Sequence, residues 1–140
     1  MSQRESVTRR LRQSSVAALA GFPERRVLLV SDNRDALESD AVLFAAFGQW
    51  MQRAYDADSA VDLATSFPPE IVFIDMEMRS VSALEVARRV RALPWMHEAQ
   101  IIAYADARRT EDPDGTREAG FDYVITKPVA LSTLLSLLRA

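Results

Sequence analysis

The 140-residue sequence predicts an α/β fold in which helices cover both faces of a parallel sheet. Short apolar runs alternate with amphipathic helical segments along most of the chain. The central run, residues 71–74, is unbroken and rich in β-branched side chains, as strands buried on both faces are. It passes directly into the carboxylate of Asp75, which would lie at the sheet edge where such folds bind ligands.

Length and composition indicate one domain with a sizeable core, since 49% of the residues are hydrophobic. The chain has no cysteine and one histidine, which excludes a disulfide framework, a thiolate metal site and a multi-histidine metal centre. No apolar run reaches the roughly 18 residues that a membrane span needs. The amino terminus lacks the apolar segment of a signal peptide. We therefore expect a cytoplasmic protein without membrane association.

Charge divides the chain into a basic extension, residues 1–24, and a domain over residues 25–140. Residues 1–26 contain six arginines and two glutamates, a charge of +4; because the whole chain carries −3, the remainder carries −7. An acidic body argues against direct DNA binding. The extension resembles a weak amphipathic helix that Gly21 and Pro23 end. It is either a mobile leader or a docking segment that could form a homodimer.

The elements follow one another in five strand–helix pairs. The strand over 27–30 is apolar, and the helix over 35–47 has one apolar face and ends before Gly48. The second pair is a strand over 50–55 and a short helix over 59–66, which Pro68 and Pro69 follow. The third strand, 71–74, precedes a helix over 82–93 with Ser82 as its N-cap.

The last two strand–helix pairs can also be delimited in the sequence. A strand over 100–104 is followed by a helix over 113–119, which Pro113 opens and Gly120 closes. A strand over 123–126 precedes a leucine-rich helix over 130–139. Right-handed crossovers favour the flavodoxin-like strand order 2-1-3-4-5 for five such units. The first and third strands are then neighbours, which places Asp32 near Asp75.

These residues indicate the chemistry of the site. The turn that begins at Ser31 has no glycine, so it does not suit a nucleotide phosphate. Two carboxylates, Asp32 and Asp75, suit a hard cation, Mg²⁺ or Mn²⁺. Lys127 follows the fifth strand and is the only lysine in the sequence. Its ammonium suits a phosphoryl oxygen or a carboxylate; the alternative is an ordinary surface lysine.

The segments VLLVSDN, IVFID and AGFDYVITKPV resemble the receiver domain of bacterial two-component response regulators, from about Arg25 to the carboxyl terminus. The resemblance implies that Asp75 accepts a phosphoryl group from a histidine kinase or a histidine phosphotransfer protein. It implies Mg²⁺ on Asp32, Asp75 and the backbone carbonyl of Glu77, with Lys127 on the phosphoryl oxygens. It also implies that a downstream protein binds the face formed by helix 4, strand 5 and helix 5, roughly residues 112–139.

The sequence departs from the family pattern at several positions. Ser31 replaces the first of two acidic residues, and Ala105 replaces a Ser or Thr at the end of strand 4. Val124 stands at the aromatic switch position, with Tyr123 one place early. Without a hydroxyl at position 105, the phosphoryl group would lose a hydrogen bond worth about 1.5–3 kcal/mol. Moving a two-state equilibrium from 1:99 to 99:1 needs roughly 5.5 kcal/mol, so this loss would remove a quarter to a half of the free energy that drives the switch.

Two other side chains could offset these changes. Tyr104 is either a different aromatic reporter of the switch or a core residue. The side chain of Glu77 could turn toward the metal and replace the charge lost at Ser31, or it could be an ordinary solvated loop residue.

Three function classes stay open. The first is a stand-alone receiver in a phosphorelay, which Asp32, Asp75 and Lys127 favour. The second is a degenerate pseudo-receiver that binds proteins independently of phosphorylation, which Ser31, Ala105 and Val124 favour. The third, a flavodoxin-like enzyme or nucleotide binder, lacks a glycine-rich loop and a nucleophile–histidine pair. We expect at most a self-catalysed phosphoacceptor.

Overall fold

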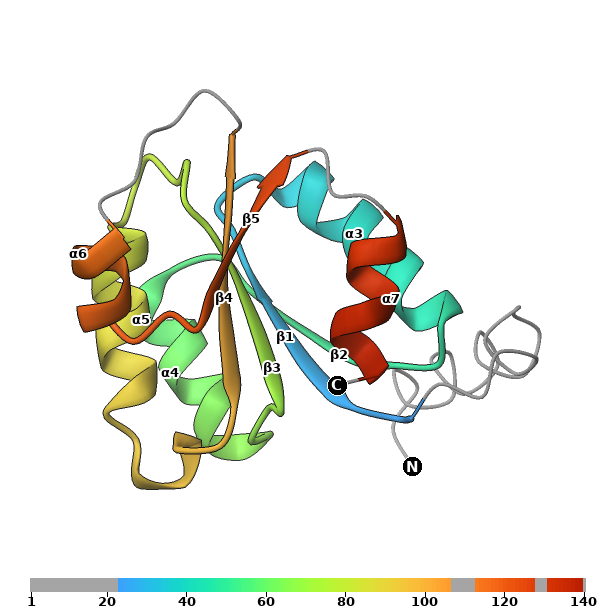
Figure 1. Cartoon of the computed structure of the whole chain (residues 1–140), viewed down its shortest axis with the longest axis horizontal. Helices are drawn as coiled ribbons and strands as arrows, with labels where there is room; N and C mark the ends of the chain where they lie inside the picture. The colour runs from blue at the N-terminus through green and yellow to red at the C-terminus, as the bar shows by residue number, and fades with distance from the viewer. Residues whose placement is uncertain (1–22, 107–112, 128–130, 140) are drawn as a thin grey trace.

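Figure 1 shows the computed structural model, which describes residues 23–106, 113–127 and 131–139. Nearly all of the predicted basic extension therefore lies outside the described residues. In the part of the chain that is described, no helix is both long enough and apolar enough to cross a membrane.

Strands and helices alternate as the sequence predicted. The elements are β1 (Arg26–Val30), α3 (Arg34–Ala46), β2 (Trp50–Ala54), α4 (Ala57–Ser66), β3 (Ile71–Asp75), α5 (Ala83–Arg91), a short 3₁₀ helix η1 (Pro94–Met96), β4 (Gln100–Asp106), α6 (Pro113–Glu118), β5 (Tyr123–Lys127) and α7 (Leu131–Arg139).

The five strands form one parallel sheet in the order β2-β1-β3-β4-β5, which confirms the predicted flavodoxin-like topology. β3 lies at the centre, and all five of its residues are buried. Its register places Asp75 beside Tyr104 of β4, and Asp106 of β4 lies beside Lys127 of β5. The carboxyl ends of the strands therefore meet at one edge, where the predicted site residues gather.

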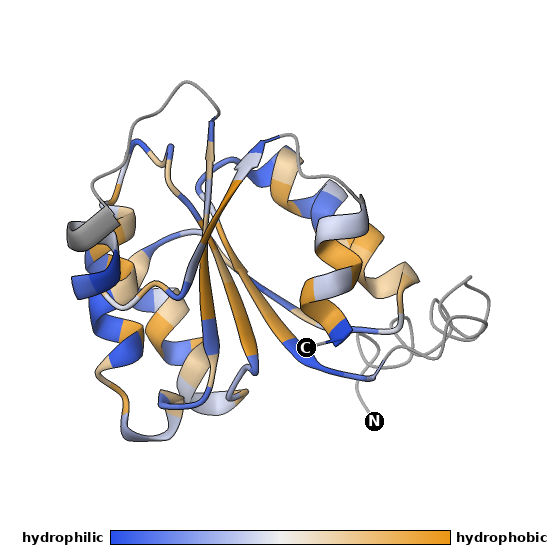
Figure 2. Ribbon diagram, in the orientation of Figure 1, coloured by the Kyte–Doolittle hydropathy of each residue, from blue (hydrophilic) through white to orange (hydrophobic). Residues whose placement is uncertain are grey.

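Helices cover both faces of the sheet. α3 and α7 lie on one face, and α4, α5 and α6 lie on the other (Figure 1). Alternate residues of β1 enter different cores: Val27 and Leu29 pack on the side of α3, whereas Leu28 and Val30 pack on the side of α4 and α5. Figure 2 shows the resulting apolar centre of the sheet. Burying one such side chain contributes roughly 1.5–3 kcal/mol.

Most boundaries differ from the predicted ones by one or two residues, and at three of them the contacts give the reason. α4 begins earlier than predicted because Asp56, not Ser59, is its N-cap and forms a reciprocal capping box with Ser59. β4 extends two residues further, to Asp106, and β5 extends one further, to Lys127, because these ends pair with each other. The extra pairing carries both strands into the edge that holds Asp75.

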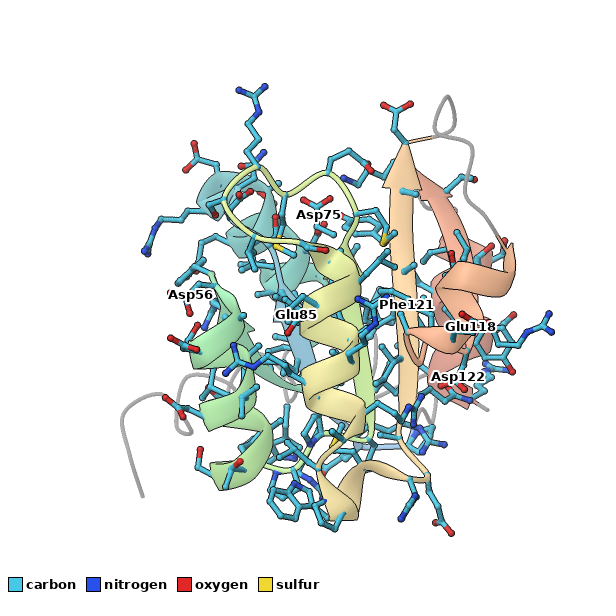
Figure 3. The ribbon with its side chains drawn as sticks, turned by 90° about the vertical axis from the view of Figure 1, so that its left-hand side faces the viewer. Asp56, Asp75, Glu85, Glu118, Phe121 and Asp122 are labelled. Carbon is cyan, nitrogen blue, oxygen red and sulfur yellow. The ribbon has the colours of Figure 1, made fainter. Side chains whose placement is uncertain are left out.

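The turn between α6 and β5 is fixed by Arg91 of α5. Its guanidinium donates to the carbonyl of Gly120 at 2.8 Å and pairs with Asp122 at 2.6 Å. Asp122 also accepts from the amide of Ile101 at 2.8 Å, and Figure 3 shows it beside the start of β5. Gly120 has a φ of +109°, which L side chains rarely adopt. These contacts set the position of β5 and thus of Lys127.

Candidate functional site

The carboxyl edge of the sheet contains a cleft of about 640 Å³. Figure 3 shows Asp75 at this edge, where β3 ends. The cleft brings together the three residues that the sequence singled out at the ends of strands 1, 3 and 5. Its lining consists of Asp32, Asn33, Asp75, Glu77, Arg79, Ser80 and Lys127.

Asp75 is a buried carboxylate with both oxygens hydrogen-bonded, and only 6% of the residue is exposed. Its Oδ1 accepts from Nζ of Lys127 at 2.7 Å and from the amide of Glu77 at 2.9 Å. Its Oδ2 accepts from the hydroxyl of Ser31 at 2.7 Å. Because a buried charge is costly unless it is paired and hydrogen-bonded, these three donors explain how Asp75 is tolerated here.

Ser31 occupies the position where the family resemblance implies a carboxylate. It is buried, and its Oγ accepts a hydrogen bond from the amide of Asn33 at 3.1 Å, while its hydroxyl donates a hydrogen bond to Oδ2 of Asp75. The serine thus supplies a neutral donor to Asp75 instead of a second negative charge. Asn33 in turn caps α3, because its side-chain oxygen accepts from the amide of Ala36 at 3.2 Å.

Lys127 bridges two carboxylates. Its Nζ lies 2.7 Å from Oδ1 of Asp75 and 3.1 Å from Oε1 of Glu77, and it also lies 4.7 Å from the ring centroid of Tyr104. Burial by itself would lower the pKa of Lys127, but the hydrogen bonds and negative charges of Asp75 and Glu77 outweigh it, so the pKa is raised. Lys127 is therefore a fixed positive charge at this edge.

The side chain of Glu77 lies at the ends of β4 and β5. Its Oε1 accepts from the amide of Asp106 at 2.6 Å as well as from Lys127. In this structure the carboxylate of Glu77 therefore contacts Lys127 and the end of β4, and the hypothesis that it replaces the charge lost at Ser31 beside a metal stays a prediction. The ammonium of Lys127 and the backbone amide of Asp106 at the end of β4 both donate to this carboxylate oxygen, and a charged donor makes such a contact strong.

Asp32 holds the loop that follows β3. Its Oδ2 accepts from the amides of Arg79 at 2.8 Å and Ser80 at 3.0 Å, and from the Ser80 hydroxyl at 2.9 Å. The amide of Ser80 is the main cause of a lowered pKa for Asp32; burial opposes this, and the Arg79 amide and the Ser80 hydroxyl add to it. Asp32 is consequently ionised at neutral pH and ties β1 to the loop beside Asp75.

The chemistry of the cleft fits a hard cation, because Asp32 and Asp75 line it together and both offer oxygen. The fit is modest: among the described residues, no three His, Cys, Asp or Glu side chains gather as a metal-binding group. Two carboxylates and a backbone carbonyl such as that of Glu77 would leave about half of the octahedral positions around Mg²⁺ to water, and this ion usually keeps several waters.

The residues implied to act in switching take different environments. Ala105 is buried in the core on the side of α4 and α5, and it brings no hydroxyl to the cleft. Val124 is 46% exposed and Tyr123 is 51% exposed on β5. Of the predicted partner-binding face over 112–139, residue 112 and residues 128–130 lie outside the described ranges.

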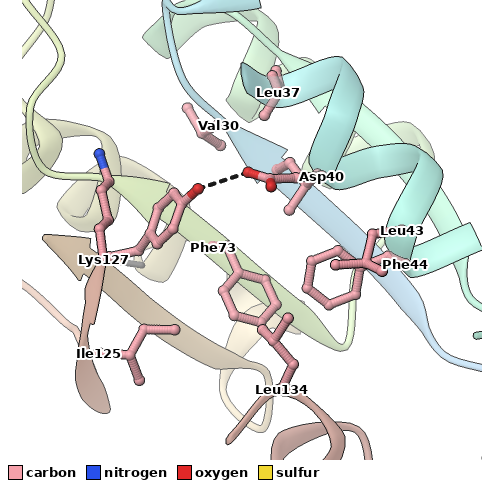
Figure 4. A pocket seen from close by; sticks show the side chains of 11 residues that line it. Val30, Leu37, Asp40, Leu43, Phe44, Phe73, Ile125, Lys127 and Leu134 are labelled. Carbon is pink, nitrogen blue, oxygen red and sulfur yellow. Dashed lines mark hydrogen bonds between the residues drawn. The ribbon is translucent and has the colours of Figure 1, made fainter. Parts of the chain in front are cut away.

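Tyr104 is neither freely exposed nor purely a core residue. Its hydroxyl donates to Oδ2 of Asp40 on α3 at 2.6 Å, at the wall of a cavity of about 330 Å³ between α3, the sheet and α7 (Figure 4). Burial, with the hydrogen bond and charge of Asp40, strongly raises the pKa of Tyr104. The side chain therefore links β4 to α3 beside Lys127.

The sequence analysis missed two contributors to this edge. Asp40 lies one turn from Leu37 and Phe44 on the apolar face of α3, so its position in the sequence could have signalled a buried partner. The amide of Asp106 leaves no signal in the sequence, because every residue except proline has a backbone N–H and only the fold places this one beside Glu77.

Comparison with known proteins identifies related chains. The family model described as the response regulator receiver domain matches residues 27–139. The chain is 30% identical over 115 residues to the response regulator MprA of Mycolicibacterium vanbaalenii, covering 82% of this chain and 49% of MprA. It is 29% identical over 115 residues to MprA of Mycobacterium avium, covering 82% of this chain and 50% of that protein. The chain thus spans about half the length of these curated relatives.

Solved structures share the fold. A receiver domain (CheY-like) from Methylobacillus flagellatus gives a TM-score of 0.73 at 22% identity, over 83% of this chain and 97% of that chain. A second match is a chain in the co-crystal structure of the Saccharomyces cerevisiae histidine phosphotransfer signaling protein Ypd1 with the receiver domain of its downstream response regulator Ssk1. Its TM-score is 0.72 at 20% identity, over 84% of this chain and 88% of that chain.

Proposed function

The chain belongs to the response regulator receiver domain family of two-component signal transduction, and we propose that it accepts a phosphoryl group on Asp75 and signals through protein contacts. One observation carries the proposal: Lys127, the only lysine, lies 2.7 Å from Oδ1 of a buried Asp75 at the carboxyl edge of the sheet. A carboxylate held beside a cation at this edge is well placed to act as a nucleophile toward phosphorus.

The transfer step uses groups that are already in place. An oxygen of Asp75 forms a bond to phosphorus while the bond from phosphorus to a histidine nitrogen of the donor breaks, and that nitrogen keeps the electron pair. Lys127 supports the step with positive charge beside the reacting oxygens. Ser31 holds the other oxygen of Asp75 and so fixes the orientation of the carboxylate.

Asp32, Asp75 and the backbone carbonyl of Glu77 would hold Mg²⁺. When bound, such an ion neutralises negative charge on the phosphoryl oxygens. Asp32 also holds the loop amides of Arg79 and Ser80, so it keeps the walls of the cleft together.

A histidine kinase or a histidine phosphotransfer protein is the proposed donor. Supporting this, a receiver of the same fold was crystallised with the phosphotransfer protein Ypd1. The downstream partner would bind the face formed by α6, β5 and α7, where Tyr123 and Val124 expose apolar surface on β5.

A second candidate function is a protein interaction module that works without phosphorylation. Two observations favour it: Ala105 lacks the hydroxyl that the family uses at the end of β4, and the Glu77 carboxylate already engages Lys127. In this case Asp75 would be a structural carboxylate only.

Phosphorylation by a small phosphodonor separates the two candidates. Purified protein is incubated with phosphoramidate and Mg²⁺, and its intact mass is measured beside Asp75→Asn and Asp58→Asn. Asp58 is the matched control, because its side chain is 87% exposed and pairs only with Arg89 among the contacts of the described residues. We expect a phosphate-sized gain in the wild type and the control that Asp75→Asn abolishes. No gain in the wild type would favour the interaction module.

A further inference from the structure

Two donors at the carboxyl edge converge on one oxygen of Glu77. Oε1 accepts from the amide of Asp106 at 2.6 Å and from Nζ of Lys127 at 3.1 Å. The same Nζ lies 2.7 Å from Asp75. We infer that the Glu77 carboxylate occupies the anion position beside Asp75 and competes with the phosphoryl group for these donors. This inference rests on the proposed function.

The competition follows from the small number of donors. A phosphoryl group on Asp75 adds three strong acceptor oxygens and a charge of about −1.5 to −2. Among the described residues, Lys127 is the cation that directly contacts Asp75, and its ammonium already donates to both Asp75 and Glu77. The neighbouring Ala105 has no side-chain donor to offer in compensation. A phosphoryl group can therefore take up these donors only where Glu77 gives them up.

Charge reinforces the conflict. A phosphoryl group bound to Lys127 would lie next to the negative carboxylate of Glu77 in a partly buried cleft, where like charges repel more strongly than in water. Glu77 would have to leave before or during the transfer.

The position of Glu77 allows this movement. The residue lies in the loop between β3 and α5, and its side chain is 31% exposed, so it can turn toward solvent without disturbing the core. Glu77 thereby acts as a positioning residue: it holds Lys127 and the end of β4 together while Asp75 is unmodified, and it slows modification of Asp75. In the unphosphorylated protein, the Glu77 carboxylate would then already place a negative charge on the donors that the phosphoryl group would use.

The rate of phosphorylation tests the competition. Wild type, Glu77→Gln and Glu85→Gln are treated with phosphoramidate and Mg²⁺, and the phosphorylated fraction is followed by intact mass. Glutamine keeps the shape but removes the charge. Glu85 is the matched control, since its side chain is 55% exposed on α5 and pairs with Arg88. We expect Glu77→Gln to react about tenfold faster, a difference of about 1.4 kcal/mol in the barrier, with Glu85→Gln unchanged.

The outcomes separate this inference from the proposed function. Phosphorylation of the wild type with an equal or lower rate in Glu77→Gln would overturn the competition alone. No phosphorylation of any of the three proteins would overturn both proposals.

A second measurement tests the placement of Glu77 without a phosphodonor. Hydrogen exchange at the amide of Asp106 should be about tenfold faster in Glu77→Ala than in the wild type, because the amide loses its acceptor. Equal exchange would overturn the inference.

Discussion

The hydroxyl of Ser31 donates to Oδ2 of Asp75 at 2.7 Å, so a serine at the end of β1 supports the carboxylate at the end of β3. Both residues are buried, and the parallel pairing of β1 with β3 brings them together. The position that usually adds negative charge in this family here stabilises the charge that is present.

Replacing Ser31 by alanine should lower the free energy of unfolding by about 1.5–3 kcal/mol, since Asp75 loses a hydrogen bond to its charged form. Urea unfolding at neutral pH measures the change. Ser136→Ala is the control, because Ser136 is exposed on α7 and only bonds back to the carbonyl of Ser132. Equal stabilities of Ser31→Ala and the wild type would contradict the assigned contact.

The pair formed by Asp75 and Lys127 should show coupling in a double-mutant cycle. We compare urea unfolding of wild type, Asp75→Asn, Lys127→Met and the double variant. Because the pair is in direct contact and Asp75 is buried, we expect a coupling energy of about 1–3 kcal/mol. A coupling energy within about 0.3 kcal/mol of zero would mean that the ion pair does not persist in solution.

Tyr104 predicts a pH dependence at the alkaline end. Its pKa is raised from 10.0, because of burial first and then Asp40. Because the pKa of Tyr104 is higher in the folded than in the unfolded state, its contribution to stability is fully present below the unfolded-state pKa. This contribution is lost as the pH rises from the unfolded-state pKa through the folded-state pKa. The stability difference between wild type and Tyr104→Phe should therefore be constant from about pH 7 to 9 and shrink above about pH 10. A difference that stays constant up to about pH 11.5 would contradict the buried hydroxyl.

Gly120→Ala should lower the free energy of unfolding by about 1–3 kcal/mol. The residue has a φ of +109°, and a Cβ there would lie 3.0 Å from Cβ of Arg91. Thermal unfolding compares this variant with Gly115→Ala. Gly115 lies within α6, and the positive φ values among the described residues belong to Gly48 and Gly120. Alanine at 115 should be neutral or stabilising, and an unchanged Gly120→Ala would show that this turn adjusts freely.

The topology of the sheet could be predicted from the sequence because the strands are apolar runs and Gly or Pro residues mark the ends of several helices. The run before Asp75 is buried on both faces, as predicted, and the pairing order follows from right-handed crossovers. The meeting of Asp32, Asp75 and Lys127 at one edge follows from that order alone.

The partners within the site could not be predicted in the same way. Glu77 was expected to be solvated or to face a metal, yet its side chain contacts an amide of β4 and Lys127. Such a choice depends on which donors the finished fold leaves within reach, not on local pattern. The link from Tyr104 to Asp40 joins residues that are 64 positions apart, which no local pattern connects.

Reductive trapping of the phosphorylated protein tests the central claim most directly. Borohydride reduces an aspartyl phosphate to homoserine, and peptide mass spectrometry then locates the modified residue. We expect homoserine at position 75, dependent on the phosphodonor, with Asp32 and Glu77 unchanged. Homoserine at another residue, or none in protein whose intact mass shows the added phosphate, would contradict Asp75 as the phosphoacceptor.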